Sequence, residues 1–170
     1  MARERDNVRD AVGRALKSLY ASESRLMQVG VGERTLVGHL ARHLQPEVDA
    51  WGEEWDVDTE YNRMSGDHDE VTYKYLLDVL GDSRRPAYPD LIVHQRGVDG
   101  WDGGNLLVVE AKRSPTHRDR LEDHAKVVAW MRELQYQHGL RLELWPAAAG
   151  VSWVSALDDP RVIVPAQALD

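Results

Sequence analysis

The chain has 170 residues, of which 42% are hydrophobic and 29% charged, and its net charge at pH 7 is −8. This length suits one domain that buries roughly 70% of its unfolded surface. Cysteine is absent, which excludes disulfides and thiolate metal sites. No apolar run approaches the ~18 residues that span a membrane, and the charged N-terminus lacks the apolar core of a signal peptide. We therefore expect a cytoplasmic protein with no membrane partner.

The negative net charge by itself argues against a nucleic-acid partner, because phosphate binding depends on Lys and Arg. The basic residues are, however, concentrated between Arg84 and Arg120, whereas the acidic surplus lies mainly between Asp49 and Glu70. A protein with such separated charges remains compatible with a DNA substrate.

Two amphipathic helices are expected in the first fifty residues. Apolar residues recur at three- and four-residue spacing from about Arg5 to Tyr20, and again from about Val31 to Leu44. Gly30 and Gly32 separate the two helices, and Pro46 lies just beyond the end of the second.

Three strands are expected next, at residues 55–62, 91–96 and 105–111. The run LLVVEA in the third is apolar on both faces, which is typical of a central strand. The loop GVDGWDGG before it has the length of a hairpin connection with an enlarged tip. In the longer insertion between the first two strands, a short helix is expected from about Glu70 to Leu80, ended by Gly81.

A further helix is expected from about Arg118 to Gln137, with Gly139 as its stop, followed by strands at residues 141–145 and 151–155. A strand-helix-strand crossover implies one parallel pair inside a mixed sheet. The sequence therefore predicts an α/β fold with a mixed central sheet flanked by helices.

Charged residues stand at the ends of two of these strands. Asp90 follows Pro89 at the start of one strand, and Glu110 and Lys112 lie two residues apart at the end of the next. Side chains alternate along a strand, so Glu110 and Lys112 point to the same face. If the two strands pair as a hairpin, Asp90 and Glu110 meet at one end of the sheet.

Two neighbouring carboxylates suit a divalent cation, because they repel each other unless a cation lies between them. A small set of hard oxygen ligands, to which the carbonyl of Ala111 could belong, favours Mg²⁺ or Mn²⁺. Such a metal can activate water against a phosphodiester, and a nearby lysine can stabilise the charge that develops on phosphorus. Each fragment alone is more often a solvated strand end, so the interpretation depends on their combination.

The segments YPDLIVHQRG and NLLVVEAKR resemble the PD-(D/E)xK, or restriction-endonuclease-like, nuclease superfamily. The stretch from VDTEYNR to EDHAKV resembles compact bacterial members, and the resemblance covers roughly residues 33–145. The expected element order matches the αβββαβ core of that superfamily. The resemblance implies a Mg²⁺-dependent (or Mn²⁺-dependent) endonuclease that hydrolyses phosphodiester bonds in DNA. One domain would span residues 1–170, with a helical extension at 1–24 and the core at 31–147.

Carried over by motif position, Asp90 and Glu110 would be catalytic metal ligands and Lys112 the catalytic lysine. Glu33 fits the place of a glutamate that family members add from the helix before the first strand, as a further catalytic metal ligand. Alternatively, Glu33 stabilises the first turn of its helix, where a carboxylate favours the helix dipole. The backbone carbonyl of Ala111 would complete the ligand set.

Further polar residues near the motif are candidate contacts to phosphate. The candidate substrate-binding residues are Gln95, Arg96, Arg113 and Lys126. Asp123 and Lys126 could equally form a surface ion pair. Glu60 and Tyr61 could line the same pocket, and the alternative for Glu60 is that it faces solvent.

Two functions follow from these observations. The intact motif favours a metal-dependent nuclease, whereas the acidic charge leaves room for a catalytically inactive nuclease-fold module that binds or regulates a protein partner. A small nuclease without a recognition domain often needs a homodimer or a partner protein for targeting. The exposed first helix and four tryptophans are candidate contact surfaces, although tryptophans are more commonly buried: Trp51, Trp55, Trp101 and Trp153.

Overall fold

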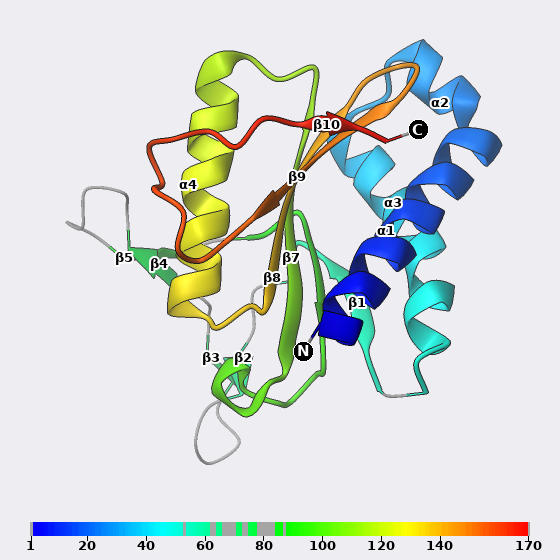
Figure 1. Cartoon of the computed structure of the whole chain (residues 1–170). Coiled ribbons are helices and arrows are strands. Elements are labelled where there is room, and N and C mark those ends of the chain that lie inside the picture. Colours follow the sequence, from blue (N-terminus) through cyan, green and yellow to red (C-terminus); the bar gives the residue numbers. More distant parts are fainter. Residues whose placement is uncertain are drawn as a thin grey trace.

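The computed structural model is an α/β structure in three layers, with a six-stranded mixed sheet between two groups of helices (Figure 1). It describes the backbone of residues 2–52, 54–61, 64–65, 71–72, 75–77, 84–86 and 88–169, and the side chains of residues 7–52, 54–61 and 88–169. The helices are α1 (Ala2–Ser22), α2 (Ser24–Val29), α3 (Glu33–Asp49), the 3₁₀ helix η2 (Gly100–Asp102) and α4 (His117–Glu133). The strands are β1 (Asp56–Thr59), β2 (Met64–Ser65), β3 (Val71–Thr72), β4 (Tyr75–Leu77), β5 (Arg84–Pro86), β6 (Leu91–His94), β7 (Asn105–Arg113), β8 (His138–Leu144), β9 (Ala149–Val154) and β10 (Gln167–Ala168).

The central sheet has the order β1-β6-β7-β8-β9-β10. Strands β7 and β8 are parallel and joined by α4, whereas every other neighbouring pair in this sheet is antiparallel. The predicted mixed sheet with one parallel crossover is therefore confirmed. A parallel pair needs such a crossover because a tight hairpin can join only antiparallel strands.

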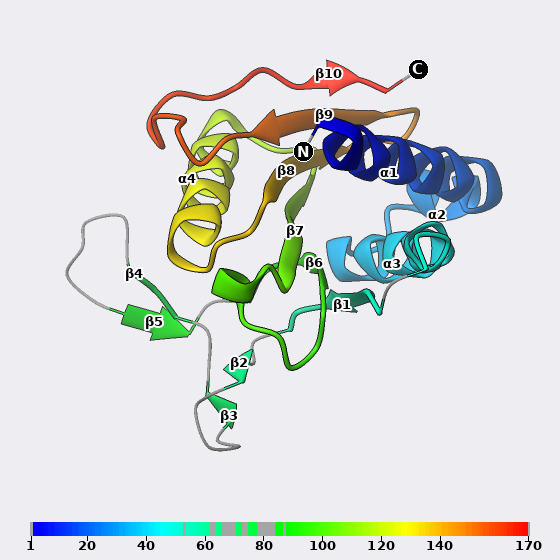
Figure 2. The same cartoon turned by 60° about the horizontal axis from the view of Figure 1, so that its bottom comes forward.

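Each face of the sheet packs against its own helices (Figure 2). Helices α1 and α3 contribute their apolar stripes to the larger core cluster, together with alternate residues of the central strands. Helix α4 covers the other face, where Trp130 is 1% exposed and packs near Ile92 and Val108. The predicted first helix is confirmed: Leu16 and Leu19 on one side of it are fully buried, while Arg14 and Lys17 on its other side are exposed.

Helix α3 continues beyond its expected end, and Pro46 lies inside it. Proline removes one backbone hydrogen bond from a helix. The last turn is nevertheless formed, and Val48 within it is fully buried against the core. A short helix that the sequence did not indicate, α2, fills the connection before α3 and ends at Gly30, whose φ is 79°.

Helix α4 ends at Glu133, and Gly139, which was expected to stop it, lies in β8 instead. A Cβ atom at position 139 would lie 2.6 Å from Val127 and 2.5 Å from Met131, both on α4. The glycine therefore allows the helix to lie close against the sheet.

The helix predicted at residues 70–80 is wrong where the structure can test it, because residues 71–72 and 75–77 are strands. The segment VTYKYLL is rich in β-branched and aromatic residues, which favour strands. The rest of that prediction, with Gly81, lies outside the described residues. None of the described helices is long and apolar enough to cross a bilayer.

Candidate active site

The register of the β6–β7 hairpin brings Asp90 and Glu110 together. Leu91 pairs with Val109, and Ile92 with Val108. Continuing the antiparallel register by one residue sets Asp90 opposite Glu110, and directly opposite residues share a face. That face is the one under α4, because Ile92 and Val108 belong to the core cluster formed with this helix.

Pro89 and Asp90 change the hydrogen bonding at the end of the hairpin. The same register sets Pro89 opposite Ala111, and proline has no N–H with which to bond the Ala111 carbonyl. The N–H of Ala111 donates to the carboxylate of Asp90 at 2.8 Å. Because the N–H and C=O of one residue point to the same side of an extended strand, the Ala111 carbonyl faces the same region as Asp90.

Glu110 is 3% exposed and is held from α4. Trp130 donates its indole N–H to one carboxylate oxygen at 3.2 Å, and the Lys126 ammonium lies 3.3 Å from the other. Lys126 also lies 3.2 Å from Asp123. Asp123 is 4% exposed, whereas the Lys126 side chain is 49% exposed, so the pair joins a buried carboxyl to a surface lysine. Oδ2 of Asp123 has no hydrogen-bond partner among the described residues.

Glu33, the first residue of α3, joins the cluster at the C-terminal end of β7. One of its oxygens accepts a hydrogen bond from the Arg113 N–H at 2.9 Å, and the other lies 3.7 Å from the Lys112 ammonium. The side chain therefore ties the start of α3 to the end of β7. Its charge also acts on Asp90.

Burial shifts the pKa values of both facing carboxyls upward. It raises the pKa of Asp90 to about 6, with the Ala111 hydrogen bond opposing the shift and the charge of Glu33 adding to it. It raises the pKa of Glu110 to about 8, where Lys126 opposes the shift and Asp90 adds to it. Burial disfavours the charge on Lys126, but Glu110 and Asp123 outweigh burial and raise the pKa of this lysine.

The cluster carries a formal excess of negative charge, because four carboxyls (Glu33, Asp90, Glu110 and Asp123) face two lysines (Lys112 and Lys126). Within the described part of the chain, no three His, Asp or Glu side chains are already arranged to hold a metal ion. The candidate ligands are instead two facing carboxylates and one main-chain carbonyl. Hard oxygen donors that repel one another, next to the unpartnered oxygen of Asp123, fit a divalent cation.

A second group of charged residues lies on β8, next to the carboxylate cluster on β7. Arg141 pairs in register with Glu110, and Glu143 with Lys112. Arg120 on α4 donates twice to Glu143, at 2.8 and 3.0 Å. Neither β8 residue was among the predicted site residues, although the alternation in GLRLEL could have indicated them.

The structure does not bring Gln95 and Arg96 to the site. Both lie beyond the end of β6 opposite to Asp90, and Arg96 forms ion pairs with Asp58 and Asp56. Strand geometry separates them from Asp90 because each residue advances the chain by ~3.3 Å.

The remaining candidate side chains have other partners. The Arg113 guanidinium donates to the carbonyls of Val31 and Met27, so only its main chain reaches Glu33. Glu60 lines a small pocket together with Asp90, as one of its two predictions states, and it also forms an ion pair with the Arg34 guanidinium at 2.7 Å. Tyr61 packs on the His94 ring. Of the four predicted substrate contacts, Lys126 alone lies within the carboxylate cluster.

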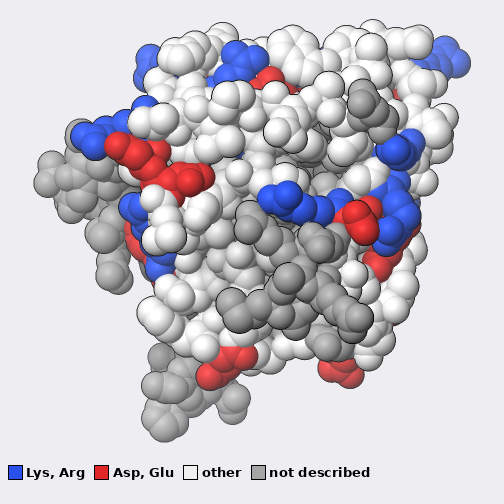
Figure 3. Space-filling model, in the orientation of Figure 1, with Lys and Arg blue, Asp and Glu red and all other residues white. Residues whose placement is uncertain are grey.

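Positive and negative side chains are interspersed on the surface shown in Figure 3, without a continuous basic field on its described part. On this face, the described basic residues therefore form no open patch, and the side chains of Arg84 and Arg85 lie outside the described residues. Arg118 and Arg120 illustrate the reason, because each forms an ion pair with a glutamate.

No protein-family model matches the chain, and no curated protein matches it significantly. Its function therefore has to be inferred from the site itself.

Proposed function

We propose that this protein is a metal-dependent nuclease of the PD-(D/E)xK type that hydrolyses phosphodiester bonds in DNA. The observation that carries the proposal is the juxtaposition of Asp90 and Glu110 on one face of the β6–β7 hairpin, with Lys112 two residues further along β7. With the separate strands β2 to β5 set aside, the order α3, β1, β6, β7, α4, β8 supports the proposal because it agrees with the αβββαβ arrangement of that superfamily.

Four side chains of the cluster and one main-chain carbonyl have roles in this proposal. Asp90, Glu110 and the carbonyl of Ala111 would hold Mg²⁺ or Mn²⁺, which when bound lowers the pKa of water and offsets charge on the phosphoryl oxygens. Lys112, which is partly exposed beside the cluster, orients the attacking water or contacts the phosphate. Glu33 positions Lys112 and the end of β7, and it is a candidate for a further ligand.

Burial of these carboxylates lowers the stability of the folded state, which supports a chemical role for them. A buried acid without a matching cation destabilises the native state. The pKa of Glu110 rises to about 8 although Lys126 lies beside it, so the lysine does not fully compensate the burial of this carboxyl. A bound divalent cation would supply the missing positive charge.

The test is cleavage of plasmid, single-stranded DNA and RNA in Mg²⁺, Mn²⁺ or EDTA. Wild-type protein should cleave DNA only with metal, and Asp90→Asn and Lys112→Ala should each reduce the rate at least about 100-fold. The matched control is Asp102→Asn, which changes an exposed aspartate in η2 and should leave the rate unchanged. Cleavage that survives in both Asp90→Asn and Lys112→Ala would refute the site.

A second candidate function is a nuclease-fold module that binds a partner without turnover. The position of Lys126 favours it, because this ammonium already lies between Glu110 and Asp123, where a cation would act. In that case the wild-type protein would neither cleave any of the three nucleic acids nor bind Mn²⁺ in calorimetry.

A further inference from the structure

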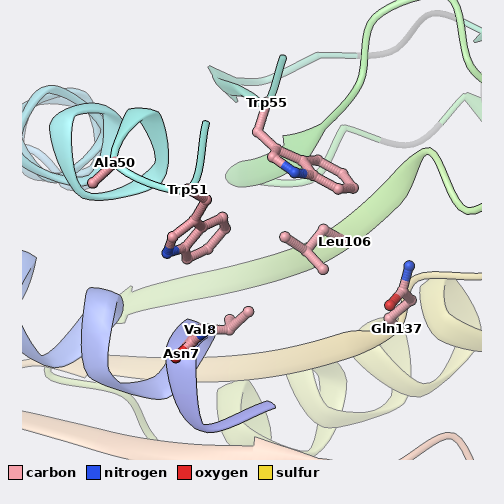
Figure 4. Close-up of a pocket in the computed structure, with 7 residues that line it drawn as sticks. All are labelled: Asn7, Val8, Ala50, Trp51, Trp55, Leu106 and Gln137. Carbon is pink, nitrogen blue, oxygen red and sulfur yellow. The ribbon is translucent and has the colours of Figure 1, made fainter. Parts of the chain in front are cut away.

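A cavity of about 420 Å³ lies near the start of β7, at the opposite end of this strand from the carboxylate cluster. The distance from Leu106, in its wall, to Glu110 is about 13 Å along the strand. Figure 4 shows the side chains of Trp51, Trp55, Leu106 and Val8 gathered around one space, with Gln137 toward its other end. Its volume lies within the range of small-molecule sites, ~300–1,000 Å³.

The backbone beside the cavity contains a β-bulge in strand β7. The pairing of β6 with β7 shifts between Val93 and His94, which leaves Leu106 as an extra residue without a partner in β6. This bulge turns Leu106 from the α4 face to the core cluster of α1 and α3. Bulges of this kind often re-aim a side chain beside a functional site.

The two tryptophans lie in the connection between α3 and β1, and Gln45 on α3 holds this connection in place. The Gln45 side chain donates to the Trp55 carbonyl at 3.0 Å and accepts from the Val57 N–H at 2.7 Å. Gly52, with a φ of 74°, provides the turn between Trp51 and Trp55. Both indoles are half-buried, so they are fixed in place while part of each remains open to the cavity and solvent.

The lining combines aromatic surface with amide groups. Among the described residues that line it, none is charged. Asn7 and Gln137 contribute exposed carboxamides, each of which has two N–H donors and an acceptor oxygen, and the Gln137 nitrogen uses one donor on the Gly103 carbonyl at 3.3 Å. The Asn7 carboxamide makes no hydrogen bond to any described residue. Indole faces next to amides suit a flat, uncharged ring whose edge carries donors and acceptors.

We propose that this cavity binds a nucleobase, stacked on Trp55 and Trp51 and bonded at its edge by Asn7 or Gln137. Stacking on aromatic side chains accepts every base because each has a π-face, and amides bond base edges. The cavity is separate from the carboxylate cluster, so base binding does not depend on the proposed nuclease function.

The test is calorimetric titration of the full chain with adenosine, guanosine, cytidine and thymidine, beside ribose and benzyl alcohol as probes that lack a base. At least one nucleoside should bind saturably, and ribose should not bind. Trp55→Ala should weaken binding about fivefold or more, whereas Trp55→Phe, which keeps a ring, should retain most of it. The matched control is Trp145→Ala, in a tryptophan beyond the far end of β8, which should bind as the wild type does.

Three outcomes would overturn the proposal. The first is that no nucleoside gives a saturable binding heat, and the second is that benzyl alcohol binds with the same affinity as the nucleosides. The third is that a Trp55→Ala variant with the melting temperature of the wild type binds nucleosides with unchanged affinity. If Trp55→Ala fails to fold, Asn7→Ala together with Gln137→Ala must weaken nucleoside binding for the proposal to stand.

A base of this kind could belong to a free nucleotide or to a nucleic-acid strand. Titrations with a nucleoside monophosphate and with a short single-stranded oligonucleotide distinguish these sources. The ligand that binds with the higher affinity identifies the source of the base.

Discussion

The two faces of strand β7 differ sharply. Toward α1 and α3, the residues Leu107, Val109 and Ala111 form an unbroken apolar row. Toward α4, the row is apolar only at Val108 and then becomes charged at Glu110. Burying charge rarely stabilises a fold more than apolar packing would. The comparison therefore teaches that the first face supplies stability, and that the charged half of the second is retained for another purpose.

The largest effect on stability is expected on the apolar face. Leu107→Ala should lower the free energy of unfolding by about 2–5 kcal/mol, because it removes fully buried methyl groups and leaves a cavity. In a chain of this size the Tm should fall by roughly 5–15 °C. Thermal melts followed by circular dichroism measure this, and a loss below ~1 kcal/mol would contradict the division between the faces.

A substitution on the charged face is expected to change the free energy of unfolding by a smaller amount and in the opposite direction. Glu110→Gln should raise the metal-free stability at pH 8 by ~1–2 kcal/mol, because it removes a buried carboxyl that is costly to ionise. The folded pKa of Glu110, about 8, lies above the usual 4.5, so the folded state holds a proton that the unfolded state loses. Wild-type stability should therefore fall as pH rises between these two values, and the variant should show a flatter profile.

The matched control for Glu110→Gln is Glu122→Gln on the solvent-facing side of α4, where the carboxylate is 53% exposed. This control should follow the wild-type pH profile in EDTA. A Glu110→Gln variant with a steeper decline than the wild type would show that the carboxylate is stabilising as it stands.

The smallest effect is expected outside the cluster. Arg96→Ala should cost ~1 kcal/mol or less, because its ion pair with Asp58 is partly exposed and screened by solvent. DNA cleavage by this variant should equal that of the wild type, since Arg96 lies past the far end of β6. A cleavage rate reduced more than about tenfold would restore the predicted role of Arg96 in substrate binding.

The sequence predicted the main elements of the fold because their hydrophobic periodicity is strong. Helices α1, α3 and α4 and strands β6 to β9 lie close to their expected positions. The prediction failed where one residue type is compatible with two different local structures. Gly139 can stop a helix or allow close packing in a strand, and a contact between α4 and β8 decides between them.

For the site, strand alternation was enough to group Glu110 with Lys112, and the hairpin register adds Asp90. The burial of Asp123 could not be read from the sequence, because an i,i+3 pair with Lys126 looks the same on a solvated helix face. Arg96 was misplaced because its closeness to Asp90 in sequence becomes a long separation in an extended strand.

The most direct test of a cation site at Asp90 and Glu110 is Mn²⁺ binding by calorimetry at pH 8, where both carboxyls can ionise. Wild type and the Asp102→Asn control should bind Mn²⁺ with equal affinity, and Asp90→Asn and Glu110→Gln should each bind at least about tenfold more weakly. Wild-type affinity in both site variants, or no binding by the wild type, would contradict the account.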